Sequence, residues 1–83
     1  MNSSDGSRIV VGEPNWSPLE MVLPTSECAD YMYIGRVGQV ELYKHQLTRR
    51  YLNISADGRR FYRFRDGMYV EIDRQSALDH VHS

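Results

Sequence analysis

Seven aromatic and arginine residues in the second half of the chain are its main candidates for functional chemistry. They are Tyr43, Arg49, Tyr51, Phe61, Arg63, Arg65 and Tyr69. The strand register derived below places the three tyrosines and Arg63 in one row across the outer face of a sheet. Aromatic rings on a sheet can stack bases and guanidinium groups can contact phosphates, which is the chemistry of single-strand nucleic-acid binding. Tyrosine and arginine are also enriched at protein interfaces, and a solvated ladder of the same residues would only stabilise the sheet.

Other residues capable of catalysis or metal binding are isolated from one another. Cys28 has no histidine that the sequence marks as its base, so we expect a buried structural thiol. His45 lies at the end of a predicted strand, where we expect an exposed polar side chain rather than a general acid or base. His80 and His82 do not face each other on a helix, so no metal site is predicted. These residues predict a protein without catalytic activity, cofactor or metal.

The charges are distributed unevenly along a chain whose net charge is −1. Residues 36–65 carry eight Lys or Arg and two acids, whereas residues 1–35 carry one Arg and five acids, and residues 66–83 one Arg and four acids. The basic block favours an anionic partner, and acidic flanks that fold over it would oppose one. Within the block, Arg49-Arg50 and Arg59-Arg60 lie at loop edges, where they could bind an anion or be solvated.

Length and composition indicate one small domain that spans residues 1–83. With 83 residues, of which 41% are hydrophobic, the chain can bury one thin core and is marginally stable alone. Its single cysteine excludes an internal disulfide framework. No apolar run approaches the ~18 residues of a membrane span, and the polar N-terminus does not resemble a signal peptide, so we expect a cytoplasmic protein without membrane contact.

A β-meander of four antiparallel strands is predicted for residues 38–73. Asp57-Gly58 and Asp66-Gly67 separate alternating hydrophobic runs, which is a strong hairpin signal. A segment at residues 31–34, rich in tyrosine and other β-formers, can add a fifth strand, and residues 8–11 can add an edge strand.

The length of the hairpin loops decides which residues face the core. Two-residue turns would place Arg63 and Arg65 on the apolar face, where burying guanidinium groups is costly. Three-residue loops with glycine in a bulge turn Tyr62 and Phe64 inward instead, and we predict these, with a five-residue loop at 45–49 in the preceding hairpin. The predicted inner face comprises Val40, Leu42, Leu52, Ile54, Tyr62, Phe64, Met68, Val70 and Ile72.

Short helices are predicted on both sides of the meander. In Ser17-Pro18-Leu19-Glu20 the serine is predicted to cap a helix, with proline at its first position, and Pro24 ends that helix. Asp73 is a natural cap for a C-terminal helix over residues 74–82, which would pack on the inner face of the sheet. The polar residues 1–7 are predicted to form a disordered tail. The expected fold is therefore α+β, a four- or five-stranded antiparallel meander with a short C-terminal helix and a short N-terminal helical segment on one face.

The predicted function is that of a small, non-catalytic protein-interaction module. The marginal size and the tyrosine–arginine row favour self-association, or contact with another protein, through the outer sheet face or an edge strand. The alternative is single-stranded nucleic-acid binding through the same face.

Overall fold

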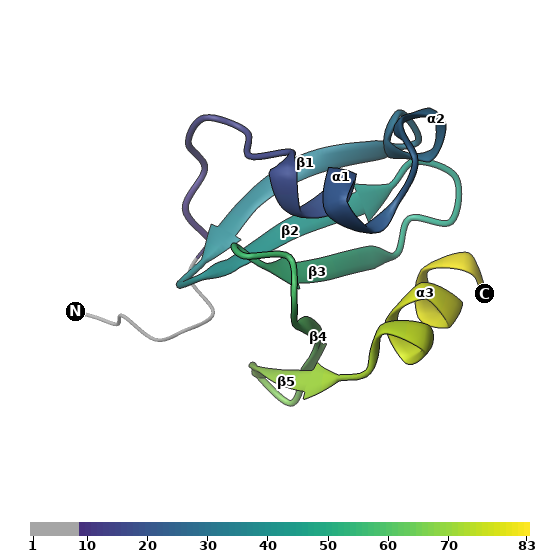
Figure 1. Cartoon of the computed structure of the whole chain (residues 1–83). Helices are drawn as coiled ribbons and strands as arrows, with labels where there is room; N and C mark the ends of the chain where they lie inside the picture. Colours follow the sequence, from purple (N-terminus) through teal and green to yellow (C-terminus); the bar gives the residue numbers. More distant parts are fainter. Residues whose placement is uncertain (1–8) are drawn as a thin grey trace.

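Residues 9–83, which the computed structural model describes, form an α+β fold (Figure 1). The strands of this region are β1 (Tyr31–Val37), β2 (Val40–His45), β3 (Tyr51–Ser55), β4 (Phe61–Arg65) and β5 (Met68–Ile72). The helices of the same region are α1 (Ser17–Val22), α2 (Thr25–Cys28) and α3 (Arg74–His82). The predicted fold class is confirmed, with the five-stranded alternative and both helical segments. The tail predicted for residues 1–7 lies outside the described residues.

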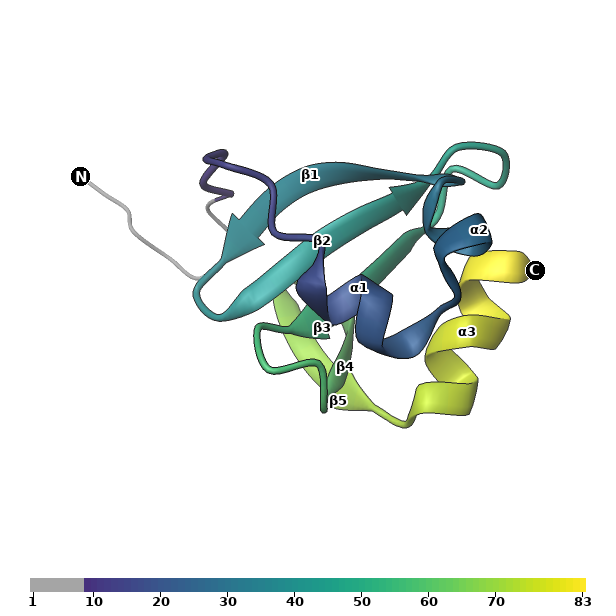
Figure 2. The same cartoon turned by 45° about the horizontal axis from the view of Figure 1, so that its top comes forward.

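The strands form one antiparallel sheet in the order β1-β2-β3-β4-β5. Helices α1 and α3 lie on the same side of this sheet, with α3 against β3 and β4 and α1 against β3 (Figures 1 and 2). The β4–β5 hairpin twists away from β1–β3 and extends past the helices. The sheet therefore has a covered half and a projecting half.

The turn between β4 and β5 is a two-residue turn, so the predicted three-residue loop is wrong. Asp66 and Gly67 have φ angles of 51° and 82°, the two positive values that a type I′ turn requires. Arg65 consequently pairs with Met68. Asp-Gly is one of the few residue pairs that readily adopt these angles, so the turn chemistry itself favours the shorter loop.

The other two loops also differ from the predicted lengths by one residue. In the β3–β4 loop the Ser55 N–H donates to the Arg60 carbonyl oxygen at 2.9 Å, so four residues lie between the last bonded pair. In the β2–β3 loop the His45 N–H donates to the Arg50 carbonyl oxygen at 2.9 Å, which again leaves four residues between the bonded pair. Because side chains alternate along a strand, each one-residue change reverses which side of the neighbouring strand faces the core.

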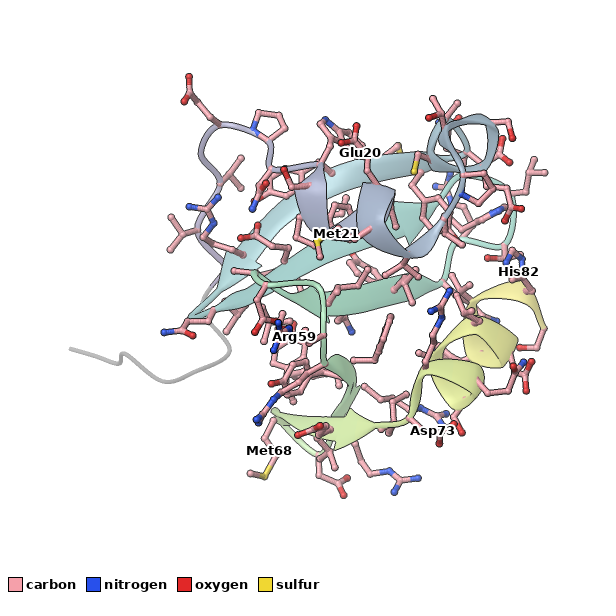
Figure 3. All side chains as sticks on the ribbon, viewed as in Figure 1. Glu20, Met21, Arg59, Met68, Asp73 and His82 are labelled. Atoms are coloured by element: carbon pink, nitrogen blue, oxygen red, sulfur yellow. The ribbon has the colours of Figure 1, made fainter. Side chains whose placement is uncertain are left out.

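Burial of arginines, the reason for rejecting two-residue turns, does not occur. Arg63 and Arg65 do lie on the helix-facing side, opposite Val70 and Met68. They are nevertheless exposed, and the turn end of the hairpin extends beyond the helices (Figure 1). Met68 lies at the hairpin tip, far from α3 (Figure 3). The desolvation cost that guided the prediction is therefore never incurred.

The core lies between the covered half of the sheet and the helices. Its buried residues are Leu19, Val22, Leu23, Tyr31, Tyr43, Leu52, Ile54, Phe61, Ala77 and Val81. Tyr43 and Phe61, predicted on the outer face, belong to this core and are 0% and 5% exposed. Tyr62 and Phe64, predicted inside, lie on the opposite face, and Phe64 is 49% exposed. Three residues of the predicted inner face pack in or against the core on the helix-facing side, namely Leu52, Ile54 and Ile72. Val40 and Leu42 lie on the opposite face. Met68 and Val70 are exposed.

Leu42 is fully buried although it lies on the face opposite the helices. Its cross-strand partner is Gly35, where β1 bulges with φ 147°. A Cβ at Gly35 would lie 2.8 Å from Ile9 Cγ2 and from the Val10 carbonyl oxygen, so the N-terminal segment runs directly against β1. Val10 and Arg36 exchange backbone hydrogen bonds of 2.8 and 2.9 Å. The predicted N-terminal edge strand is thus reduced to a single bridge.

The helix ends follow local signals in part. The Asp73 carboxylate accepts a hydrogen bond from the Ser76 N–H at 3.0 Å, which confirms the predicted cap of α3. A hydrogen bond from the Ser76 hydroxyl at 2.7 Å, followed by the one from the N–H, lowers the pKa of Asp73. The predicted Ser17 cap of α1 is wrong, because the cap position is Trp16 and no side chain caps it. The Ser17 N–H instead donates to Asn15 Oδ1 at 3.3 Å.

Candidate functional site

The divergence of the β4–β5 hairpin from β3 opens a cleft. β3 and β4 pair at two positions, ending at Asn53–Tyr62, whereas β4 and β5 stay paired to the turn. The cleft has a volume of about 500 Å³. It is lined by Ile9, Arg49, Arg50, Tyr51, Asn53, Arg63, Phe64, Tyr69 and His80. We call it the Arg–Tyr cleft.

The β2–β3 loop holds Arg49 and Arg50 at one edge of the cleft. Nδ1 of His45 accepts hydrogen bonds from two backbone N–H groups of this loop, at 3.2 and 3.3 Å. The Thr48 hydroxyl donates to the Val81 carbonyl oxygen at 2.7 Å, which ties the loop to the last turn of α3. These internal contacts fix the loop without using either guanidinium group.

Aromatic rings form the two walls of the cleft. Tyr51 stands on the β3 side, 36% exposed, with the Lys44 ammonium 5.7 Å from its ring centroid. Phe64 and Tyr69 stand on the hairpin side as a cross-strand pair whose ring centroids are 4.9 Å apart. Partial burial, followed by the proximity of Tyr51, raises the pKa of Tyr69. The walls therefore present ring surface to solvent from both sides of one gap.

The gap also leaves backbone groups without partners in the sheet. In the register of β3 and β4, Tyr51 would face Phe64, but the pairing ends before it reaches them. Ladder hydrogen bonds alternate along an antiparallel pair, and Ser55 and Arg60 form one such bonded position. Counting from that position, the N–H and C=O groups of Tyr51 and Phe64 point into the gap.

The electrostatic environment of the cleft is positive. Its lining contains three arginines and no carboxylate. The ion pairs within residues 9–83 are Arg36–Glu41 and Arg60–Glu71, and neither involves a cleft residue. Burial lowers the pKa of His80, and the nearby positive charges of Arg63 and Arg50 lower it further.

Asn53 lies in the lining of the cleft and is 3% exposed. Its Nδ2 donates to the Tyr62 carbonyl oxygen at 3.2 Å. Its Oδ1 has no hydrogen-bond partner in the described part of the chain. A buried acceptor without a partner costs roughly 1–3 kcal/mol, so a donor supplied from the cleft would be favourable.

The structure brings together four of the seven predicted site residues. Arg49, Tyr51, Arg63 and Tyr69 all line the Arg–Tyr cleft. Tyr43 and Phe61 do not belong to the site, because both are buried in the core on the other face. Arg65 is exposed beside the hairpin turn and does not line the cleft.

Sequence reasoning missed several cleft residues for different reasons. Phe64 was placed inside by the incorrect loop length, and the Asp66-Gly67 turn signal would have placed it correctly. Arg50 was considered only as part of a loop-edge pair. Asn53 and His80 carry no local signal, since the opening of the sheet and the packing of α3 bring them to the cleft.

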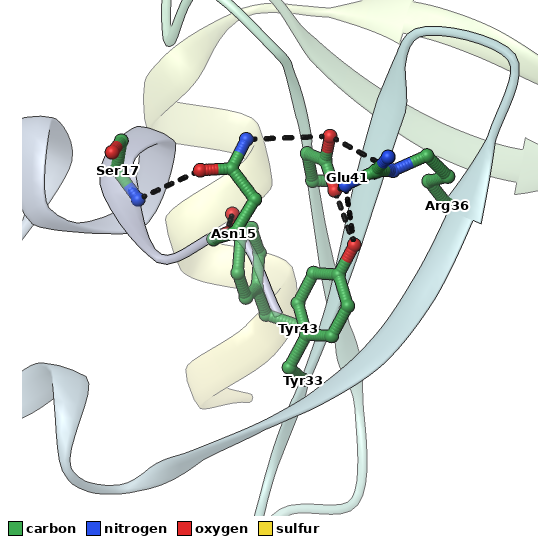
Figure 4. A network of polar contacts seen from close by, with 6 residues as sticks. All are labelled: Asn15, Ser17, Tyr33, Arg36, Glu41 and Tyr43. Carbon is green, nitrogen blue, oxygen red and sulfur yellow. Dashed lines mark hydrogen bonds and ion pairs between the residues drawn. The ribbon is translucent and has the colours of Figure 1, made fainter. Parts of the chain in front are cut away.

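A second polar cluster serves to attach the N-terminal segment to the sheet (Figure 4). Glu41, 3% exposed, accepts hydrogen bonds from the Tyr33 hydroxyl at 2.5 Å and from Arg36 Nε and Asn15 Nδ2 at 3.4 Å. The Tyr43 hydroxyl donates to the Asn15 carbonyl oxygen at 2.5 Å. Every member has a partner, so the cluster accounts for the buried carboxylate without a ligand.

A second hollow, of about 430 Å³, lies between α1, the β3–β4 loop and the start of α3. It carries both signs of charge, with Arg60 and Glu71 3.7 Å apart. The Arg74 guanidinium donates to the Val22 carbonyl oxygen at 3.1 Å. Arg60 and Arg74 therefore have partners, unlike the arginines of the Arg–Tyr cleft.

The remaining candidates for catalysis take structural roles. His45 is 6% exposed, so the expectation of an exposed side chain is wrong; its Nδ1 is occupied by the loop contacts described above. Cys28 is half-buried, and its thiol contacts the Leu23 carbonyl oxygen at 3.6 Å. Burial, followed by Glu20 and Glu27, raises the pKa of this thiol. Among residues 9–83, no cluster of three or more His, Cys, Asp or Glu side chains could hold a metal ion.

Comparison of the chain with protein-family models, curated proteins and solved structures finds no match. None of the helices in the described region is long and apolar enough to cross a membrane.

Proposed function

We propose that the protein is a small non-catalytic interaction module that self-associates by pairing β5 of one copy with β5 of another. The supporting observation is the open edge of β5. It is the last strand in the sheet order, and no residue within 9–83 pairs with its outer edge. At the opposite edge of the sheet, Val10 bridges Arg36. Sheet edges are commonly protected by lysine, proline or a bulge, and β5 has none of these.

The hydrogen-bonding groups on this edge suit a two-fold pair. The residues that flank a two-residue turn, Arg65 and Met68, form a hydrogen-bonded pair. The alternation then directs the N–H and C=O groups of Tyr69 and Glu71 outward. A two-fold axis at Val70 would pair Tyr69 with Glu71 of the second copy and form four backbone hydrogen bonds.

The side chains of β5 are compatible with the same arrangement. Met68 and Val70 are 60% and 40% exposed, and Ile72 lies on their side of the strand. Pairing would join two such apolar rows into one. Glu71 would face Tyr69 of the second copy rather than another Glu71, so no like charges are opposed. A single pair of strands buries less than a standard interface, so we expect dissociation in the micromolar range.

The test compares two substitutions at one position. Glu71→Pro removes an outward N–H that the hairpin does not use, and Glu71→Thr keeps it while removing the same charge. Sedimentation velocity from about 5 to about 500 µM protein should show a dimer for the wild type and Glu71→Thr, and a monomer for Glu71→Pro. Val70→Lys, which opposes two charges at the axis, should also be monomeric, whereas Leu47→Lys at an 82% exposed loop position should not.

Circular dichroism should show that all four variants keep the wild-type fold. A monomeric wild type throughout this concentration range, or a dimeric Glu71→Pro, would contradict the proposal.

The non-catalytic part of the proposal is supported by how the reactive side chains are used. The ring nitrogen of His45 holds a loop, and the raised pKa of Cys28 disfavours a thiolate. We also propose the cytoplasm as the compartment, where a single cysteine stays reduced.

A further inference from the structure

The Arg–Tyr cleft has the chemistry to hold a phosphate group. Arg49, Arg50 and Arg63 line it without a carboxylate, and the ion pairs formed by residues 9–83 leave all three unneutralised. Like charges gathered around one gap repel one another, so an anion between them stabilises the folded protein. Guanidinium groups present forked N–H donors that match phosphate oxygens.

The walls of the same cleft suit a flat ring. Tyr51 faces the gap from β3, and the Phe64–Tyr69 pair faces it from the hairpin. Tyr51 and Phe64 are 36% and 49% exposed, so part of each ring is open to stacking. Stacking on aromatic side chains tolerates any base, because every base has a π-face.

Polar groups in the cleft can bond to the edge of such a ring. The Oδ1 atom of Asn53 is buried and has no partner within the described residues. The backbone N–H and C=O groups of Tyr51 and Phe64 point into the gap left by the sheet. A base carries N–H donors and ring acceptors on its edge, which complement these groups.

We propose that the Arg–Tyr cleft binds a nucleoside phosphate, with the phosphate among Arg49, Arg50 and Arg63 and the base between Tyr51 and Phe64. The volume of about 500 Å³ lies within the range of small-molecule sites. Because the cleft is open to solvent at its aromatic walls, the ligand can be a free nucleotide or one unit of a single strand. All the residues come from one copy of the chain, so the inference does not depend on self-association.

Fluorescence anisotropy with labelled ten-nucleotide single-stranded RNA and DNA tests this inference. A ten-nucleotide strand offers several neighbouring phosphates, so if each of the three arginines neutralises one of them, affinity should fall about 20-fold when salt rises from about 50 to about 200 mM. Tyr51→Ala should weaken binding about five-fold or more, whereas Tyr51→Phe, which keeps the ring, should not. Competition with adenosine monophosphate distinguishes the two sources, since equal affinity per site indicates a free nucleotide and tighter oligomer binding indicates a strand.

Arg63→Gln and Arg65→Gln form the matched pair of charge variants. Both remove one charge from an exposed residue of β4, but only Arg63 lines the cleft. Arg63→Gln should weaken binding at least five-fold and reduce the salt dependence by about one phosphate contact, whereas Arg65→Gln should change affinity less than two-fold. As an independent readout, NMR titration should show the pKa of His80 rising when the ligand is bound, because the phosphate offsets the charges of Arg63 and Arg50.

Several results would overturn the inference. One is the absence of binding to any oligomer or to adenosine monophosphate at about 50 mM salt. Another is an equal loss of affinity in Arg63→Gln and Arg65→Gln, which would indicate general attraction to a basic surface. A third is equally strong competition by inorganic phosphate or a phosphotyrosine peptide, which would remove the base from the proposed ligand.

Discussion

Two phenylalanines on one strand provide the sharpest test of the sheet register. Phe61 and Phe64 are three residues apart on β4 and therefore lie on opposite faces. Phe61 is 5% exposed and lies in the core, whereas Phe64 is 49% exposed in the Arg–Tyr cleft. The register that three-residue loops would impose reverses these environments. We expect Phe61→Ala to destabilise the protein much more than Phe64→Ala.

The expected difference follows from burial. Replacing a buried phenylalanine by alanine costs about 3–5 kcal/mol. Phe64 keeps half of its surface in water and packs mainly on Tyr69, so its replacement should cost about 1 kcal/mol. The whole domain, at roughly 0.05–0.15 kcal/mol per residue, has about 4–12 kcal/mol of stability. Phe61→Ala should therefore remove about a quarter or more of it.

Urea unfolding measures both costs. Trp16 is a suitable probe, because its ring lies 5.8 Å from that of core residue Tyr43. With a slope of about 1–3 kcal/mol per molar urea, Phe61→Ala should lower the midpoint by about 2 M and Phe64→Ala by about 0.5 M. Because the dimer is expected to dissociate in the micromolar range, measurement at about 0.1 µM protein keeps it from contributing. Phe61→Leu, which keeps most of the buried volume, should fall between them.

A greater loss of stability in Phe64→Ala than in Phe61→Ala would refute the register. It would also contradict both proposals, because the outward direction of Phe64 and the outward N–H and C=O groups of Tyr69 and Glu71 depend on the same pairing.

Two further predictions concern ionisation and backbone conformation. Burial raises the pKa of the Tyr31 hydroxyl from 10.0 to about 12. Between pH 10 and pH 12 this hydroxyl is therefore ionised in the unfolded chain and protonated in the folded protein, so the free energy of unfolding falls as pH rises. Tyr31→Phe should reduce the shift in urea midpoint between pH 7 and about 11, and an unchanged shift would contradict the assignment. Gly58 and Gly67 have φ angles of 78° and 82°, but a Cβ would meet Met21 Sδ at 2.8 Å only at Gly58. In thermal melts Gly58→Ala should therefore lower the Tm more than Gly67→Ala does. The difference should disappear when both substitutions are made in a Met21→Ala variant, and equal losses of Tm in the wild-type protein would contradict this.

Local signals in the sequence were sufficient to predict the elements. Asp57-Gly58 and Asp66-Gly67 mark hairpins, Pro24 ends the first helical segment, and Asp73 caps the last helix. Each of these signals acts within a few residues of chain, through backbone angles or a single hydrogen bond. The order and type of these elements therefore follow from the sequence, whereas it left the number of strands at four or five.

The register could not be predicted, because the more apolar face of β4 is not the one that packs in the core. One face carries Phe61 with Arg63 and Arg65, and the other carries Tyr62 with Phe64. Hydrophobicity alone favours the second face, which carries no charge, and so selects the wrong register. The tertiary structure buries Phe61 in the core while leaving both arginines exposed.

The residues of the cleft were predicted better than their arrangement. Arg49, Tyr51, Arg63 and Tyr69 were expected as part of one row across an intact sheet, and they meet instead around a gap in it. Their types, and so their preference for anions and flat rings, are properties of the sequence. Their proximity depends on the point at which β3 and β4 separate, which is a property of the twisted sheet.

The amino-acid sequence by itself determined the antiparallel meander, the capped C-terminal helix and the arginine-rich chemistry of the second half, because these depend on neighbouring residues. Tertiary structure alone decided which aromatic rings are buried, where the sheet opens and which side chains face one another across the cleft. These features depend on how long each strand stays paired and on where α1 and α3 pack, and such contacts join segments far apart in the chain.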